Sequence, residues 1–150
     1  MDDQGQARAC TAIGERLCPF EQSLLTNQAD CPQARRVCIA ERPGVHCISD
    51  HAQARCLAFL ELTAGQARFA LKMAHPEGRL SRAKSLRVQI GGLRGVQASL
   101  TPEGADGPVT DVDGLLGAAI ARFGDLERLP FQVIVQQIAA YRRPSSRKKR

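Results

Sequence analysis

The sequence predicts a mostly α-helical protein: a small helical domain whose cysteine-rich N-terminal half forms a metal or cluster site and packs on a C-terminal helical bundle. Three observations support this class. Apolar residues recur at three- and four-residue intervals through most of the chain beyond position 50. All six cysteines of the 150 residues lie between positions 10 and 56. Aromatic residues make up only 4% of the chain, so the core must consist mainly of aliphatic side chains.

Turn residues and charge divide the chain into three predicted regions. Residues 1–75 form a cysteine-rich helical, cluster-binding region, and residues 76–141 form a helical region for support or docking. The boundary is predicted by the turn-forming run His75-Pro76-Glu77-Gly78. Residues 142–150 form a basic tail that we expect to be disordered.

Short helices are expected in the N-terminal region. Asp30 is a good N-cap for one of them, and the run Arg42-Pro43-Gly44 indicates a turn followed by a loop over 45–47. The predicted helices are Ala7–Leu17, Pro19–Thr26 with proline at its first position, and Cys31–Glu41.

Longer helices are expected from position 51 onward. The apolar stripe from Leu80 to Leu100 favours a helix over a strand at 85–90, and the helix keeps its glycines if another helix packs closely against them. Residues 101–110 have the composition of a loop. The other predicted helices are 51–73 capped by Ser49 or Asp50, about 111–123 capped by Thr110 or Asp111 and closed by Gly124, and 130–141 beginning at Pro130.

The density of cysteines allows three interpretations: a disulfide framework, a metal or iron–sulfur site, or small buried thiols. The acidic, polar start of the chain predicts no secretory signal, which favours a cytoplasmic protein with reduced thiols over an exported disulfide protein. Inert burial explains one or two cysteines better than six. We therefore expect a metal or cluster site.

The spacing of the cysteines favours a cluster over zinc. The chain has no CxxC pair, whereas structural zinc sites usually use ligands two to four residues apart, and the two-cluster ferredoxin run also needs such pairs. A [4Fe-4S] cluster tolerates scattered cysteines better, because each thiolate approaches its own iron. Zinc remains the alternative. Two cysteines precede proline, Cys18-Pro19 and Cys31-Pro32, as does the last cysteine of the bacterial ferredoxin run.

The best predicted ligand set combines two cysteines on one helix with one on a loop and one on the next helix. Within the predicted helix 31–41, residues seven apart share a face at a separation of about 10 Å. The metal ligands expected on this basis are Cys31, Cys38, Cys47 and Cys56. Cys18 is the next candidate for binding the cofactor, and Cys10 is the weakest. His46 and His51 are more simply a loop residue and an exposed first-turn residue than ligands.

The second half of the chain carries no recognisable catalytic set. It has no Ser–His–Asp combination and no HExxH motif, and DVDG at 111–114 lacks the glutamate that completes a calcium loop. The hypothesis is therefore a small cytoplasmic iron–sulfur protein that acts in electron transfer, redox sensing or cluster handling for a protein partner, and no catalytic set favours an enzyme over this role. No stretch is long and apolar enough for a transmembrane helix.

The net charge of +6 supports an alternative hypothesis. Six of the 21 basic residues lie in the last nine positions, which hold no acid, so the rest of the chain is neutral. The alternative is a zinc-stabilised or metal-free helical binding module that contacts nucleic acid through this tail. The residues that would make the contact are Arg142, Arg143, Arg147, Lys148, Lys149 and Arg150.

Overall fold

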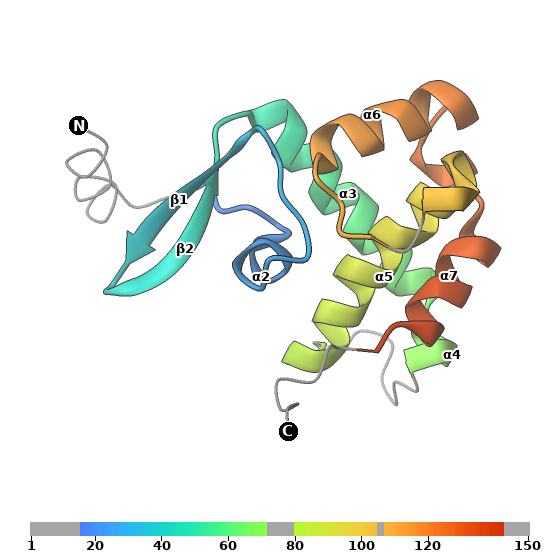
Figure 1. Ribbon diagram of the computed structural model, residues 1–150, viewed down its shortest axis with the longest axis horizontal. Coiled ribbons are helices and arrows are strands. Elements are labelled where there is room, and N and C mark those ends of the chain that lie inside the picture. The colour runs from blue at the N-terminus through green and yellow to red at the C-terminus, as the bar shows by residue number, and fades with distance from the viewer. Residues whose placement is uncertain (1–15, 72–79, 105–106, 143–150) are drawn as a thin grey trace.

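The computed structural model describes residues 16–71, 80–104 and 107–142, and over these ranges the fold is mostly helical, as expected. Figure 1 shows a bundle of helices with a two-stranded hairpin extending to one side. The elements in chain order are α2 (Glu21–Leu25), β1 (Ala34–Ile39), β2 (Arg42–Cys47), α3 (Asp50–Gln66), α4 (Arg68–Leu71), α5 (Arg82–Leu100), η1 (Pro102–Gly104), α6 (Val112–Phe123), η2 (Leu126–Arg128) and α7 (Phe131–Ala140).

Helix α5 is the centre of the bundle, and its closest neighbour is α7. A Cβ atom built on Gly91 would lie 2.6 Å from the Cα of Ile138, and one built on Gly95 would lie 2.5 Å from the Cα of Ile134. The two backbones are this close because α5 has no side chain at these positions. The prediction that glycines in 80–100 serve close helix packing is confirmed.

The expected helix ends are confirmed where a side chain caps the backbone. Ser49 accepts a hydrogen bond from the backbone N–H of Ala52 at the start of α3, and Asp111 accepts one from that of Gly114 at the start of α6. Gly124 ends α6 with φ +105°, a conformation that favours glycine. The predicted helix 51–73 is divided, because α3 ends at Gln66 and α4 begins at Arg68.

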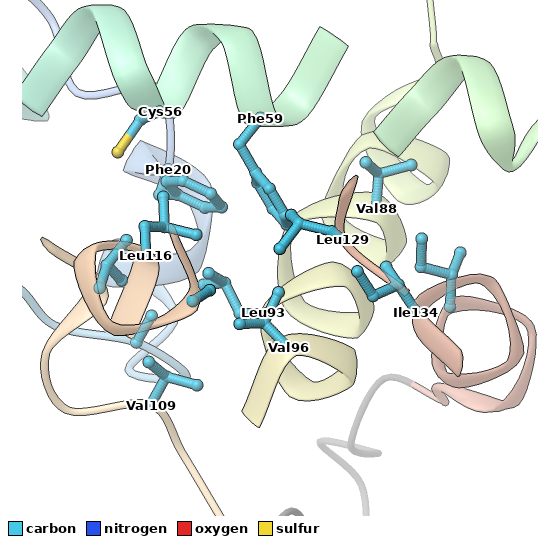
Figure 2. Packing of buried hydrophobic residues seen from close by; sticks show 14 of the residues in the cluster. Phe20, Cys56, Phe59, Val88, Leu93, Val96, Val109, Leu116, Leu129 and Ile134 are labelled. Carbon is cyan, nitrogen blue, oxygen red and sulfur yellow. The ribbon is translucent and has the colours of Figure 1, made fainter. Parts of the chain in front are cut away.

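One core joins the N-terminal and C-terminal parts of the chain. Phe20 and Phe59 are fully buried, with ring centroids 6.2 Å apart. Figure 2 shows them beside Leu93 and Leu116, which come from α5 and α6. A buried polar contact adds to this joint: the Ser23 hydroxyl of α2 donates to the Gln89 side-chain oxygen of α5 at 2.7 Å.

The predicted helix over 31–41 is wrong, because this stretch forms a turn, strand β1 and the turn of the hairpin in which β1 pairs with β2. The strands are antiparallel, and Ala34 pairs with Cys47 while Cys38 pairs with Pro43. The turn lies at Ala40 and Glu41, with φ values of +52° and +66°, and Arg42–Cys47 is a strand rather than a turn and loop. The expected helix cap at Asp30 is wrong as well: its side chain accepts a hydrogen bond from the N–H of the next residue, Cys31, and the chain then continues as a turn.

Candidate metal centre

Four cysteines line one small pocket between α2, the hairpin, α3 and the start of α6. The space left among the side chains is about 10 Å³ for a water-sized sphere, which is room for about one water molecule. Phe20, Ala52 and Val112 complete an apolar wall. The four cysteines are Cys18, Cys31, Cys47 and Cys56.

Cys18 is held by a short pairing of residues 16–18 with β2. Its N–H donates to the carbonyl of Val45 at 2.9 Å, and its carbonyl accepts from the N–H of Glu21 at 3.1 Å. The Glu21 carboxylate in turn accepts from the N–H of Val45 at 2.9 Å. These bonds fix the Cys18-Pro19 turn that leads into α2.

Cys31 lies in the turn between α2 and β1, and this turn is bonded to the segment that begins α6. The N–H of Asp30 donates to the carbonyl of Val109 at 2.8 Å, and the carbonyl of Asp30 accepts from the N–H of Val112 at 3.0 Å. The Cys31 carbonyl accepts from the N–H of Ala34 at 3.1 Å, where β1 begins. The turn therefore places Cys31 between the hairpin and α6.

Cys47 and Cys56 also line the pocket, and both are buried. Cys47 ends β2, where its N–H donates to the carbonyl of Arg16 at 2.8 Å and its thiol donates to the carbonyl of Ser49 at 3.3 Å. Cys56 lies on the buried face of α3, as predicted, and its side chain lies near that of Phe20 (Figure 2).

Burial makes the thiols of Cys18, Cys31 and Cys56 hard to ionise. Loss of solvation raises the pKa of Cys18, and likewise that of Cys56, from 9.0 to about 12. The neighbouring cysteines add a smaller upward effect, since two negative sulfurs in one pocket repel each other. Burial also raises the pKa of Cys31, although backbone hydrogen bonds from Gln33 and Asp113 oppose that rise. A positive ion is what would stabilise several thiolates here together.

The five cysteines within the described ranges are all free thiols. No group of three or more His, Cys, Asp or Glu side chains in these ranges is placed to hold one metal ion. The four pocket cysteines therefore share a pocket and interact electrostatically without forming a closed single-ion shell.

Cys38, expected among the ligands, does not line the pocket. It lies four residues along β1 from Ala34, which does line the pocket, and a strand advances about 3.4 Å per residue. Cys38 is thus about 14 Å farther along the hairpin. The wrong helix assignment is the reason for the difference, because a helix would have brought Cys38 closer to Cys31.

The other sequence candidates are placed as follows. His46 lies in β2 opposite Arg35, and His51 is exposed in the first turn of α3; neither lines the pocket. Cys10, most of the predicted helix 7–17, the boundary at 75–78 and the tail from Arg143 onward lie outside the described residues.

One sequence feature, the cysteine–proline pair, indicated the pocket residues better than the spacing of the cysteines did. The two cysteines that precede proline, Cys18 and Cys31, both line it. No motif or spacing pointed to Arg55 and Gln33, which meet Asp113 next to the pocket.

Comparison of the chain with protein-family models, with curated proteins and with solved structures finds no match in any of the three. Across residues 16–71, 80–104 and 107–142, no helix has the length and apolar character needed to cross a membrane.

Proposed function

We propose that this chain is a small iron–sulfur protein whose cluster is bound by Cys18, Cys31, Cys47 and Cys56, and that it serves in electron transfer, redox sensing or cluster handling for a protein partner. The observation that carries the proposal is the convergence of four free cysteines, from separate segments of the chain, on one buried pocket. The proposed ligand set replaces Cys38 with Cys18.

The arrangement favours a cluster over a single ion in two respects. The ligands come from two turns, a strand end and a helix, with no close pair in the sequence. No three of the side chains are placed around one ion, whereas a cluster needs only one thiolate at each iron. When bound, the cluster supplies one-electron chemistry, and the protein contributes thiolates, an apolar wall and backbone amides that set its potential.

A single zinc ion bound by the same four thiolates is the second candidate. The observation that favours zinc is the small space, which admits about one water molecule, so the pocket would have to widen to hold a cluster. Zinc would make the site structural, since zinc sites with four cysteine ligands contribute directly to folding.

The test is anaerobic purification of the wild type and of single alanine variants, followed by an absorption spectrum and by iron, sulfide and zinc analysis. The matched control is Cys38→Ala, because Cys38 is a half-buried cysteine outside the pocket. We expect iron, sulfide and broad absorbance near 400 nm (a rough expectation for iron–thiolate centres) in the wild type and in Cys38→Ala. We expect the loss of all three in Cys18→Ala and Cys56→Ala.

The other outcomes separate the candidates. A colourless wild type with about one zinc per chain, lost in the same pocket variants, would establish the zinc site instead. A cluster that is retained in Cys18→Ala and Cys56→Ala but lost in Cys38→Ala would overturn the ligand assignment. A wild type without metal would overturn both candidates.

The geometry also supports the proposal that a partner binds, and exchanges electrons, at one face of the protein beside the pocket. Leu17 directly precedes Cys18 in the sequence, and Ile48 directly follows Cys47. The two apolar residues are 40% and 45% exposed. Leu17 pairs with His46 in an antiparallel bridge, and Ile48 follows directly after the end of β2. Arg35, opposite His46, lies on the same side. A partner with an apolar centre and an acidic rim matches this surface.

A further inference from the structure

A larger cavity lies on the side of the bundle away from the hairpin, where α4, the start of α5 and the end of α7 meet (Figure 1). This open cleft has a volume of about 690 Å³, which is within the range of about 300–1,000 Å³ that is usual for small-molecule sites. None of its described lining residues belongs to the cysteine pocket, so a ligand in the cleft needs no metal at the cysteines.

Most of the wall of this cleft is apolar. Leu71 at the end of α4 and Leu86 on α5 both line it, and both are buried. Tyr141, the first residue after α7, is also buried and packs in one cluster with Leu86. Three alanines complete the wall and fill little of the space, because each side chain is a single methyl group. A wall of this kind covers the apolar body of a small ligand.

Three cationic side chains line the same cleft: Lys84 and Arg87 on α5, and Arg142 just beyond α7. None of the three forms an ion pair with a carboxylate of the described residues. The helices that form the cleft, α4, α5 and α7, contain no Asp or Glu. The first turn of α5, which carries Lys84, adds the positive end of a 19-residue helix. Within the described ranges, the positive charge at the cleft is therefore not balanced.

Both arginines are held at the end of α7 by backbone carbonyls. The Nη2 of Arg87 donates to the carbonyls of Ile138 and Ala139 at 3.2 and 3.1 Å, and the Nη1 of Arg142 donates to that of Ala139 at 3.1 Å. The Nε of Arg87 is buried and has no hydrogen-bond partner among the described residues. Because a buried donor without an acceptor is unfavourable, an oxygen atom that reaches this group would stabilise it.

We propose that this cleft binds a small organic anion, a molecule with an apolar body that ends in a carboxylate or a similar anionic group. The body packs against Leu71 and Leu86, and the anionic group lies beside Lys84 and Arg87, since guanidinium and ammonium groups are the usual partners of carboxylates. An uncharged apolar molecule would leave the cations unpaired, and an inorganic anion would leave the apolar wall uncovered.

The experiment is a titration of the full-length protein with decanoate, followed by the fluorescence of Tyr141. The chain has one tyrosine and no tryptophan, so the signal comes from a residue that lines the cleft. We expect one decanoate per chain by calorimetry, and weaker binding at higher salt concentration because the cations are partly exposed. The uncharged 1-decanol and inorganic phosphate should each bind at least about tenfold more weakly, because each makes only one of the two kinds of contact.

Single variants show whether decanoate binds at this place. Lys84→Met and Arg142→Met each remove one charge but keep an unbranched apolar side chain, and both positions are at least partly exposed, so we expect the variants to fold. Each should weaken decanoate binding about five- to tenfold. The matched control is Arg122→Met, which removes the same charge from the last turn of α6, outside the cleft, and should bind as the wild type does.

Each outcome supports or overturns the inference. A wild type that binds decanoate no more tightly than a Kd of about 1 mM would overturn it. Binding of several decanoates per chain, or equal weakening in Arg122→Met and Lys84→Met, would show attraction to the whole basic surface instead of a site. Binding of 1-decanol or of phosphate as tight as that of decanoate would overturn the proposed ligand class. All these results leave the proposed function of the cysteine pocket untouched, because the cleft and the pocket share no residue.

Discussion

The close approach of α5 and α7 makes Gly95→Ala a strongly destabilising change. The added Cβ would lie 2.5 Å from the Cα and 3.0 Å from the Cγ1 of Ile134, whereas carbon atoms pack best at about 3.5–4.0 Å. The backbone of α7 must therefore move about 1 Å away to restore that contact distance. Overpacking of this kind costs about 1–3 kcal/mol, with the upper end expected where backbone atoms collide.

Helix propensity offsets part of this cost. Alanine is favoured over glycine by about 1 kcal/mol inside a helix, which leaves a net loss of about 2 kcal/mol in the free energy of unfolding. Gly65→Ala in α3 is the matched control, because nothing lies within 4 Å of a Cβ at that position. It should gain up to about 1 kcal/mol from propensity alone.

The assay is urea unfolding of both variants, followed by far-ultraviolet circular dichroism at one fixed state of metal loading. Gly95→Ala should lower the midpoint and Gly65→Ala should raise it, with slopes close to that of the wild type. A Gly95→Ala protein as stable as the Gly65→Ala protein would refute the described contact between α5 and α7.

Two further predictions concern the cysteine pocket and its surface. The metal-free protein should lose stability as the pH rises from about 9 toward 12, because the thiols of the unfolded chain ionise at 9.0 whereas Cys18 and Cys56 stay protonated in the folded protein up to about 12. The urea midpoint, measured across this pH range, reports the loss of stability, and a midpoint that does not change with pH would contradict the burial of these thiols. Ile48→Asp should slow reduction of the loaded protein by dithionite, an anion, several-fold at low salt and less at high salt. Phe69→Asp makes the same charge change on α4, away from the hairpin in Figure 1, and equal slowing in both variants would argue against the proposed face.

The helices could be predicted because local signals and apolar periodicity agree there. Ser49, Asp111 and Gly124 mark helix ends by their own backbone hydrogen bonding or conformation, and each is found in the expected place. The helix over the stripe from Leu80 to Leu100 forms despite three glycines because α7 packs against two of them and α3 packs against Gly92, tertiary contacts that the pattern only suggested.

The hairpin could not be predicted, because the residues in its turn and in β2 are typical of other local structures. Its turn uses Ala40 and Glu41 in a left-handed conformation, where Asn-Gly would be the usual sequence signal. Pro43 and Gly44 mark a turn in most sequences but here lie inside an edge strand, where the missing N–H of proline is tolerated. Pairing with β1 and with residues 16–18 overrides these preferences.

The candidate site could be predicted in part. Three of the four proposed ligands, Cys31, Cys47 and Cys56, belonged to the expected set, and Cys18 was next in order. The sequence could not show that Cys18 lines the pocket and Cys38 does not. This difference depends on the direction in which strand β1 runs away from the pocket, and cysteine spacing carries no information about that direction.

The wall that surrounds the four cysteines is also part of the main core, since Phe20, Leu24 and Cys56 belong to both. A metal bound in the pocket would consequently stabilise the same residues that pack α2 against the helices. At a free concentration about a hundred times its Kd, such a metal would add about 2.7 kcal/mol to the free energy of unfolding. Proteases attack the opened population of a chain, so the lifetime of this protein in a cell would rise and fall with metal supply. Its abundance would thus report on the delivery of metal before any partner is engaged.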